Sequence, residues 1–391
     1  MDMVLNRFKE EGGQTDLLAH FTQGVMERSA KFHQSVPEYA ATPLVHLDDL
    51  SQQLGVANIY AKDESERFGL NAFKGLGGIY VMAEYFRRYE GLDFNDYNEL
   101  LKMLKTHPGV TFATATDGNH GKGVAWAASL LGQKAKVFMP EGAAEHRLEA
   151  VRQLGAEATA TTLNYDDTVK ETANLAKEHG WVLLQDTAWP GYDEIPLMIM
   201  EGYTTLMSEV HAQLGDTSFN DITHVFLQAG VGSFVVAMTA AVLSKMDGNR
   251  PRIIVVEAGA ADCFHQSMKD TSGKSQQVTG SLNTVMAGLA CGAPSTQGFE
   301  MLKASADAFI RCGDGTSEHG MRLYGRPTGS DEPVVSGASG AVTLGALHAL
   351  MTEDGYSQAR QALGLDGSSN ILLINTEGDT DPDHYRQVMR E

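Results

Sequence analysis

The chain has 391 residues, a formal net charge of -20 and a sequence pI near 5.0, and 42% of its residues are hydrophobic. This length is typical of two joined domains, at about 100 to 200 residues for each domain. The negative charge opposes binding to nucleic acids and anionic membranes, because both depend on Lys and Arg neutralising phosphate. We therefore expect no nucleic-acid or membrane partner, and any anionic ligand must be held by local backbone geometry or by one placed cation.

Targeting and cysteine patterns point to the cytoplasm. The first residues lack a basic start followed by an apolar core and a cleavage site, and no run reaches about 18 uninterrupted apolar residues. The three cysteines, Cys263, Cys291 and Cys312, form no C-x-x-C pair, so neither a disulfide scaffold nor a metal site is predicted. We expect small buried hydrophobic residues at these positions. A disulfide between Cys263 and Cys291 is the alternative interpretation.

Strand-like apolar runs alternate with longer amphipathic stretches along the chain. This alternation predicts an α/β fold with mostly parallel sheets flanked by helices. A block at 89-190 is expected to form a small domain, and 1-88 with 191-391 a large domain. The turn-rich stretches at 273–292 and 313–329 are expected to be loops. The predicted strands are 111–114, 135–139, 224–228, 252–257 and 371–375.

The first glycine-rich segment, 68–78, places Lys74 among small residues just before an apolar helix-like run. The positive end of a helix and desolvation both favour the neutral, nucleophilic amine that imine formation requires. The segment is therefore suited to a Schiff-base lysine. An ordinary solvated lysine in a turn is the alternative interpretation.

The second segment, 114–123, presents polar side chains ahead of another helical pattern. Asp117 could act as a general base, and Asn119 could donate a hydrogen bond to a ring oxygen of a ligand. Turn and helix-capping duties would explain Asp117 and Asn119 equally well, and His120 could be a packed or capping histidine.

The third segment, 226–234, turns from an apolar strand into an apolar helix-like run through Gly230, Val231, Gly232 and Ser233. Successive N–H groups at a helix N-terminus can hold a phosphate. Val235 occupies the last position of the G-x-G-x-x-G dinucleotide pattern, which disfavours a nicotinamide cofactor. The segment thus predicts a phosphate loop, although glycines also serve close packing of helix on strand.

In this order, the three segments resemble the tryptophan synthase β family of pyridoxal-phosphate enzymes (fold type II). Within that family the chain is most similar to the diaminopropionate ammonia-lyases, and the likeness runs from about residue 40 to the C-terminus. It implies two domains, with pyridoxal 5'-phosphate in the interdomain cleft, and a homodimer. The motifs that carry the likeness are 62–65, 71–78, 117–121 and 185–189.

The resemblance also implies site residues. Lys74 would hold the cofactor as a Schiff base, and Asn119 would lie beside the 3′-oxygen of its ring. Thr376 stands where relatives place a hydroxyl or thiol against the pyridine nitrogen. The backbone around the cofactor phosphate would come from Gly230, Val231, Gly232 and Ser233.

The implied reaction is an α,β-elimination of 2,3-diaminopropionate, D and L, to pyruvate and two ammonia. Lys74 and Asp117 would take the α-proton from opposite faces, and Asp186 would help bind or deprotonate the amino groups of this small amino-acid substrate. Serine and threonine dehydratases of the family carry Ser at the position of Asp117, which favours the diamino substrate. A serine/threonine dehydratase and a noncatalytic phosphate-ligand binding protein are the alternatives.

Overall fold

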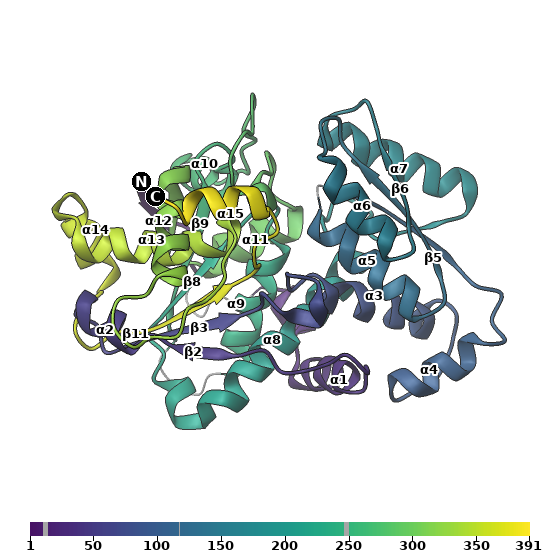
Figure 1. The fold of residues 1–391 in the computed structure, drawn as a ribbon, viewed down its shortest axis with the longest axis horizontal. Coiled ribbons are helices and arrows are strands. Elements are labelled where there is room, and N and C mark those ends of the chain that lie inside the picture. Colours follow the sequence, from purple (N-terminus) through teal and green to yellow (C-terminus); the bar gives the residue numbers. More distant parts are fainter. Residues whose placement is uncertain (11–14, 117, 246–249) are drawn as a thin grey trace. The chain divides into compact units, whose positions relative to one another are not determined.

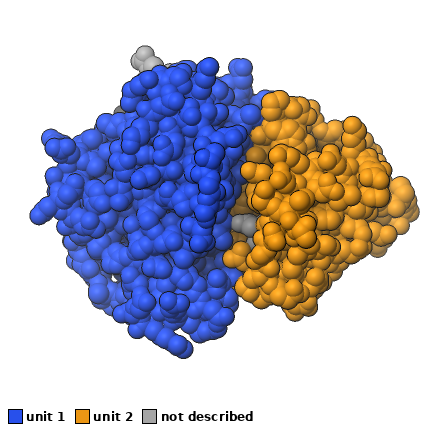
Figure 2. All heavy atoms as spheres, turned by 90° about the horizontal axis from the view of Figure 1, so that it is seen from above, with its two compact units in different colours: residues 1–23, 41–66, 206–391 blue, residues 24–40, 67–205 orange. Residues whose placement is uncertain are grey.

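The computed structural model describes residues 1–10, 15–116, 118–245 and 250–391 (Figure 1). The chain divides into two compact units, coloured in Figure 2. The larger unit comprises Met1–Gln23, Ala41–Glu66 and Leu206–Glu391, and the smaller unit comprises Gly24–Ala40 and Arg67–Thr205.

A seven-stranded sheet forms the centre of the larger unit. Its five inner strands run parallel, and the two edge strands pair antiparallel with their neighbours. Four of the inner strands are largely apolar and buried, as expected where helices cover both faces of a sheet, whereas the inner strand at 58–63 is more polar. In sheet order the strands are β1 (Asp2–Leu5), β10 (Ala308–Cys312), β9 (Arg252–Ala258), β8 (His224–Gln228), β11 (Asn370–Asn375), β3 (Asn58–Asp63) and β2 (Leu44–His46).

Helices surround this sheet, and α13 is the most deeply buried of those described, with apolar or small residues on nearly every side. It packs against β8, β11 and α12, and the α12 contact is close because Gly320 and Gly345 leave no room for a Cβ atom. The helices are α2 (Asp48–Leu54), α9 (Ser233–Lys245), α10 (Cys263–Lys269), α11 (Thr296–Ser305), α12 (Asp314–Gly325), α13 (Ala338–Thr352), α14 (Ser357–Leu363) and α15 (Pro382–Val388), with the 3-10 turns η2 (Leu18–His20), η4 (Ala287–Leu289) and η5 (Asp354–Tyr356).

The smaller unit contains a four-stranded, fully parallel sheet. In sheet order its strands are β6 (Glu157–Ala160), β5 (Lys134–Met139), β4 (Thr111–Ala115) and β7 (Val182–Leu183). The long helix α8 (Glu194–Asn220) begins in this unit and ends in the larger one. The other elements are α1 (Gln23–Gln34), η3 (Arg67–Gly69), α3 (Gly75–Arg88), α4 (Tyr97–Leu104), α5 (Asn119–Leu130), α6 (Glu145–Gln153) and α7 (Tyr165–His179).

The α/β fold with mostly parallel sheets is confirmed, and the five predicted strands coincide with β4, β5, β8, β9 and β11. The expectation of a loop at 313–329 was wrong, because residues 314–325 form α12. Gly320 of this helix serves close packing against α13. The smaller unit includes α3, which packs closely on α5 where Gly78 meets Gly123.

All three cysteines are free thiols in the structure, and Cys263 and Cys312 are buried. No helix in the described part of the chain has the length and apolar character needed to cross a membrane. Among the same residues, no group of three or more His, Cys, Asp or Glu side chains is arranged to hold a metal ion.

Candidate active site

Lys74 lies at the junction between η3 and the first turn of α3, in the smaller unit. A Cβ atom at Gly123 of α5 would lie 2.7 Å from the carbonyl oxygen of Lys74, so only glycine permits this approach. Gly78, four residues after Lys74, likewise approaches the carbonyl oxygen of Gly123, 2.6 Å from where its own Cβ atom would lie, so glycines on both helices bring the lysine backbone against α5.

The ammonium of Lys74 forms an ion pair with Asp186. Lys74 Nζ donates to Asp186 Oδ2 at 2.7 Å, and the side chains are 20% and 8% exposed. The rings of Phe73 and Tyr203 lie beside the same ammonium, with centroids 5.3 and 5.7 Å from Nζ. This arrangement keeps the lysine ordered while leaving part of its side chain accessible.

Asp186 is held in place by the short loop that follows β7. The hydroxyl of Tyr192 donates to Leu183 O at 2.8 Å and accepts from Gln185 N at 2.9 Å, which ties the two ends of this loop together. Burial by itself raises the pKa of Asp186, but the nearby ammonium of Lys74 outweighs it, and the pKa is lowered to about 2. Asp186 is therefore ionised at neutral pH.

His120, the second residue of α5, is buried. Its Nε2 lies 2.8 Å from Leu184 O, so Nε2 carries the hydrogen, because a carbonyl oxygen can only accept. Its Nδ1 lies 3.8 Å from Asp186 Oδ2 and has no hydrogen-bond partner among the described residues. Burial lowers the pKa of His120, and the ring is accordingly neutral at physiological pH.

Asn119, the first residue of α5, is half-buried. The turn before it is fixed by Thr116, whose hydroxyl oxygen accepts from Gly118 N at 3.0 Å and from Gly121 N at 3.2 Å. The structure thus brings Lys74 and Asp186 together and places Asn119 at a helix start in the same unit. Asp117, the other predicted base, lies outside the described residues.

The predicted phosphate loop belongs to the larger unit and joins β8 to α9. Gly232 has φ +111°, a conformation that favours glycine, and a Cβ atom there would lie 2.8 Å from the ring of Phe264. A Cβ atom at Gly230 would lie 3.0 Å from Gly288 O. Ser233 then begins the 13-residue helix α9, so the loop leads directly into a helix N-terminus.

Thr376 follows β11, the strand next to β8 in the sheet. The carboxyl ends of parallel strands meet at one edge, where ligands of open α/β sheets gather. Gln228, the last residue of β8, donates from its Nε2 to Thr376 Oγ1 at 3.0 Å. The buried side-chain amide of Gln228 therefore links the predicted phosphate loop to Thr376. The sequence motifs did not single out Gln228. The available signal was a glutamine at the end of a largely apolar strand.

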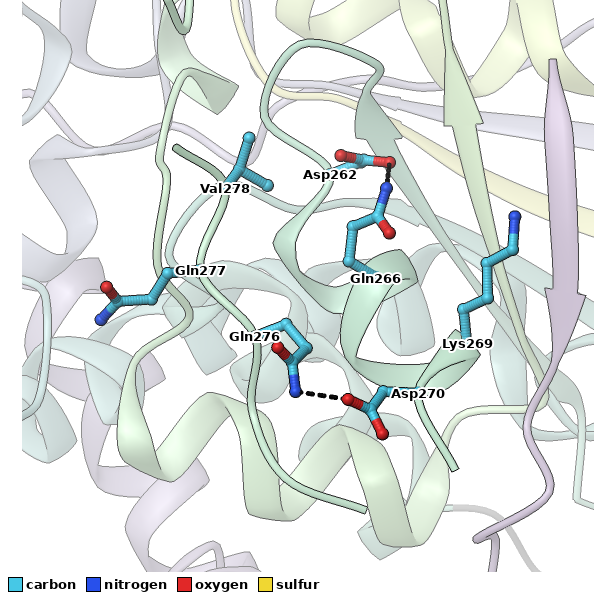
Figure 3. Close-up of a pocket in the computed structure, with 7 residues that line it drawn as sticks. All are labelled: Asp262, Gln266, Lys269, Asp270, Gln276, Gln277 and Val278. Carbon is cyan, nitrogen blue, oxygen red and sulfur yellow. Dashed lines mark hydrogen bonds between the residues drawn. The ribbon is translucent and has the colours of Figure 1, made fainter. Parts of the chain in front are cut away.

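A pocket of about 460 Å³ lies elsewhere in the larger unit, beside α10 (Figure 3). Its carboxylates are engaged by neighbouring amides: Gln266 donates to Asp262 at 3.0 Å and Gln276 to Asp270 at 2.7 Å. No predicted site residue lines it. The lining residues are Asp262, Gln266, Lys269, Asp270, Gln276, Gln277 and Val278.

Comparison with known proteins shows the family of the chain. The family model described as pyridoxal-phosphate dependent enzyme matches residues 36–377. A diaminopropionate ammonia-lyase of Salmonella typhimurium is 47% identical over 92% of this chain and 90% of its own length. The diaminopropionate ammonia-lyase of Escherichia coli K12 is 44% identical over 100% of this chain and 96% of its own.

The fold agrees with these sequence comparisons. The crystal structure of the Escherichia coli diaminopropionate ammonia lyase in complex with an aminoacrylate-PLP azomethine reaction intermediate superposes with a TM-score of 0.89. That protein is 42% identical in sequence, and the match covers 99% of this chain and 96% of the other. The chain therefore belongs to the pyridoxal-phosphate dependent enzyme family and, within it, to the diaminopropionate ammonia-lyases.

Proposed function

We propose that this pyridoxal-phosphate dependent enzyme eliminates ammonia from D- and L-2,3-diaminopropionate and yields pyruvate and two molecules of ammonia. Its relatives at 47% and 44% identity are diaminopropionate ammonia-lyases, which supports this substrate. Within the molecule, the observation that carries the proposal is the 2.7 Å pair of Lys74 with the buried Asp186. An ordered, partly exposed lysine can form a covalent link to a carbonyl, and the adjacent carboxylate suits a substrate with an additional ammonium.

The glycine loop of the larger unit fits the phosphate of the cofactor. Its two glycines have no space for a Cβ atom, and it opens a helix of 13 residues, whose first N–H groups and dipole favour an anion. This local site also accounts for how a chain of net charge -20 can hold an anionic ligand. We assign phosphate binding to the backbone of Gly230, Val231, Gly232 and Ser233.

The remaining cofactor contacts follow from hydrogen-bonding capacity. We assign Asn119 to the 3′-oxygen of the ring, because its side-chain amide can donate a hydrogen bond to that oxygen. We assign Thr376 to the pyridine nitrogen. A hydroxyl there donates a hydrogen bond but does not readily protonate the nitrogen, which favours prompt elimination over transamination.

When bound, pyridoxal phosphate withdraws electrons from the substrate Cα and makes its hydrogen acidic. In this proposal Lys74 Nζ takes that proton from one face, and the carboxylate of Asp117 takes it from the opposite face for the other stereoisomer. Asp186 binds a substrate amino group in the ammonium form. The low pKa of the Asp186 carboxyl keeps this carboxylate ionised for the contact. The α- and β-nitrogens leave as ammonia, and water supplies the keto oxygen of pyruvate.

An absorbance spectrum and a substrate panel test the proposal. We expect the purified protein, supplied with cofactor, to show a band near about 410 to 420 nm, as a lysine-linked cofactor does. Pyruvate release from D- and L-diaminopropionate should exceed 2-oxo acid release from serine and threonine. Selective turnover of the hydroxy amino acids would instead identify a serine/threonine dehydratase. Cofactor binding without a borohydride-trappable adduct would identify a noncatalytic binding protein.

The stereochemical assignment is tested separately with Asp117→Asn. If Asp117 serves one face only, this variant loses turnover of D-diaminopropionate by a larger factor than turnover of the L-isomer. Measured kcat/KM for the two isomers gives the answer directly. An equal loss for both isomers would contradict the assignment of Asp117 as the base for the D-isomer.

We also propose that the enzyme is cytoplasmic and that it is a homodimer, the dimer being what the resemblance to its family implies. Light scattering coupled to size-exclusion chromatography would report twice the 42.2 kDa chain mass. A monomer mass at the working concentration would refute this part of the proposal without affecting the proposed reaction.

A further inference from the structure

The side chain of Gln228 is buried at the carboxyl end of β8, where it is 2% exposed. Its Nε2 lies 3.0 Å from Ile374 O and 3.0 Å from Thr376 Oγ1. Longer contacts of 3.2 and 3.5 Å reach Ser339 O and Gly340 O at the start of α13. One amide nitrogen therefore faces three backbone carbonyls and one hydroxyl, all within the larger unit.

This environment fixes the orientation of the amide. Backbone carbonyl oxygens accept hydrogen bonds and cannot donate them, so the Gln228 atom that faces Ile374 and Ser339 must be the NH2 group. The reversed orientation would place the amide oxygen against three other oxygens. The two hydrogens of Nε2 serve the two shortest contacts, those to Ile374 O and Thr376 Oγ1.

The orientation of the amide determines the role of the Thr376 hydroxyl. Because Thr376 Oγ1 accepts from Gln228, its own single hydrogen must point away from Gln228. We propose that Gln228 is a positioning residue that directs the Thr376 O–H toward the pyridine nitrogen of the cofactor. This inference rests on the proposed function, and in particular on Thr376 facing that nitrogen.

Without Gln228, the Thr376 hydroxyl could turn and donate to a nearby backbone carbonyl, as threonine hydroxyls do in many loops. Its oxygen lone pairs would then face the lone pair of the nitrogen. The oxygen of the same amide favours a functional reason for the glutamine. Gln228 Oε1 is buried and has no hydrogen-bond partner among the described residues, an arrangement that destabilises the fold.

The test uses holoenzyme loaded with cofactor that carries ¹⁵N at the pyridine nitrogen, and compares Gln228→Met, Thr376→Val and the double variant. We expect both single variants to move the ¹⁵N resonance in the same direction, toward that of a nitrogen without a hydrogen-bond donor. In the Thr376→Val background, Gln228→Met should cause no further shift. Each single variant should raise the cofactor dissociation constant about 5- to 10-fold, the effect of one hydrogen bond.

Two further variants keep the test decisive if Gln228→Met folds poorly. Thr376→Ser retains the hydroxyl and should retain the wild-type ¹⁵N shift. Gln228→Glu, once ionised at higher pH, can only accept, and should draw the Thr376 proton away and reproduce the shift of Thr376→Val. Thr343→Val, at a buried threonine of α13 with no hydrogen-bond partner among the described residues, is the matched control and should change neither the resonance nor the affinity.

Two outcomes would overturn the inference: an unchanged resonance in both Gln228 variants while Thr376→Val shifts it, or an equal Gln228→Met shift with and without the Thr376 hydroxyl. An unchanged resonance in Thr376→Val would also overturn it, because Thr376 would not face the nitrogen. Failure of the proposed function has a different signature, which is absence of the absorbance band and of pyruvate release in the wild-type protein.

Discussion

Two lysines of this chain form ion pairs of equal length in very different surroundings. Lys62 Nζ lies 2.7 Å from Glu209 Oε2 in the larger unit, and Lys74 Nζ lies 2.7 Å from Asp186 Oδ2 in the smaller unit. The side chain of Lys62 is fully buried, whereas that of Lys74 is 20% exposed. The distance therefore does not show which of the two lysines a ligand can reach, but the exposed fraction of the side chain does.

The partners of the two lysines explain the difference. Lys62 also donates to Thr42 O at 2.6 Å and to Gln213 Oε1 at 3.0 Å, so polar acceptors compensate for its desolvation on several sides. Lys74 pairs with Asp186 and lies beside the rings of Phe73 and Tyr203, and because 20% of its side chain is exposed, a ligand can reach its nitrogen. We infer that Lys62 stabilises the fold and that Lys74 performs chemistry.

The largest expected effect comes from Lys74→Ala. Because no other side chain in this account forms the covalent link to the cofactor, the variant should lose the absorbance band and turnover of both diaminopropionate isomers. Its melting temperature should still show a folded protein. A retained absorbance band in this variant would show that another lysine holds the cofactor, and would contradict the contrast between Lys74 and Lys62.

Lys62→Met should have the opposite pattern. It removes the cation that lies 2.7 Å from the buried Glu209, and loss of one partner from a buried pair costs about 3 to 5 kcal/mol. Chemical denaturation should report this loss in the free energy of unfolding, while the fraction that remains folded keeps the cofactor band. Loss of the band from fully folded Lys62→Met protein would contradict a purely structural role.

The variant Asp186→Asn tests the ion pair of Lys74 through the pH dependence of the free energy of unfolding. The folded pKa of Asp186 is about 2, below its ordinary value of 3.8, so its ionised form stabilises the fold above about pH 4. This stabilisation, about 2 kcal/mol from a lowering of about two pKa units, is lost as the pH falls from about 4 to 2. Wild type should lose it across that window in unfolding titrations, and Asp186→Asn should not. Parallel acid titrations of both proteins would argue against the pairing.

The smallest effect is expected from an exposed pair. Lys170 Nζ lies 3.0 Å from Asp167 Oδ1, but the two side chains are 73% and 48% exposed. Solvent screening leaves such pairs with little net effect. Lys170→Ala should therefore leave melting temperature, cofactor band and kcat/KM unchanged within error, which makes it the matched surface control for Lys62 and Lys74.

The fold was largely predictable because its strands carry a strong local signal. The runs Ile253–Val256 and Ile371–Ile374 are apolar throughout, and they lie in β9 and β11 of the parallel sheet. The boundary of the smaller unit depended instead on tertiary packing. The contact of Gly78 with Gly123 joins α3 to α5 across 45 residues, and no local pattern encodes it.

The site was predictable only where its residues carry local signals. Lys74 and the glycine loop stand out in the sequence as a lysine and glycines at helix starts. The pairing of Lys74 with Asp186 joins residues 112 positions apart, and the acceptor role of the Thr376 oxygen depends on Gln228, 148 positions away. Such partners are set by sheet topology and become visible only in the folded chain.

Borohydride reduction of the holoenzyme followed by peptide mapping tests the central claim most directly. Reduction converts the link between lysine and cofactor into a stable pyridoxyl adduct, which mass spectrometry locates on one peptide. We predict the adduct on Lys74 and unmodified Lys62 in the same digest. An adduct on a different lysine, or none in protein that binds the cofactor, would contradict the assignment of Lys74 as the residue that holds the cofactor.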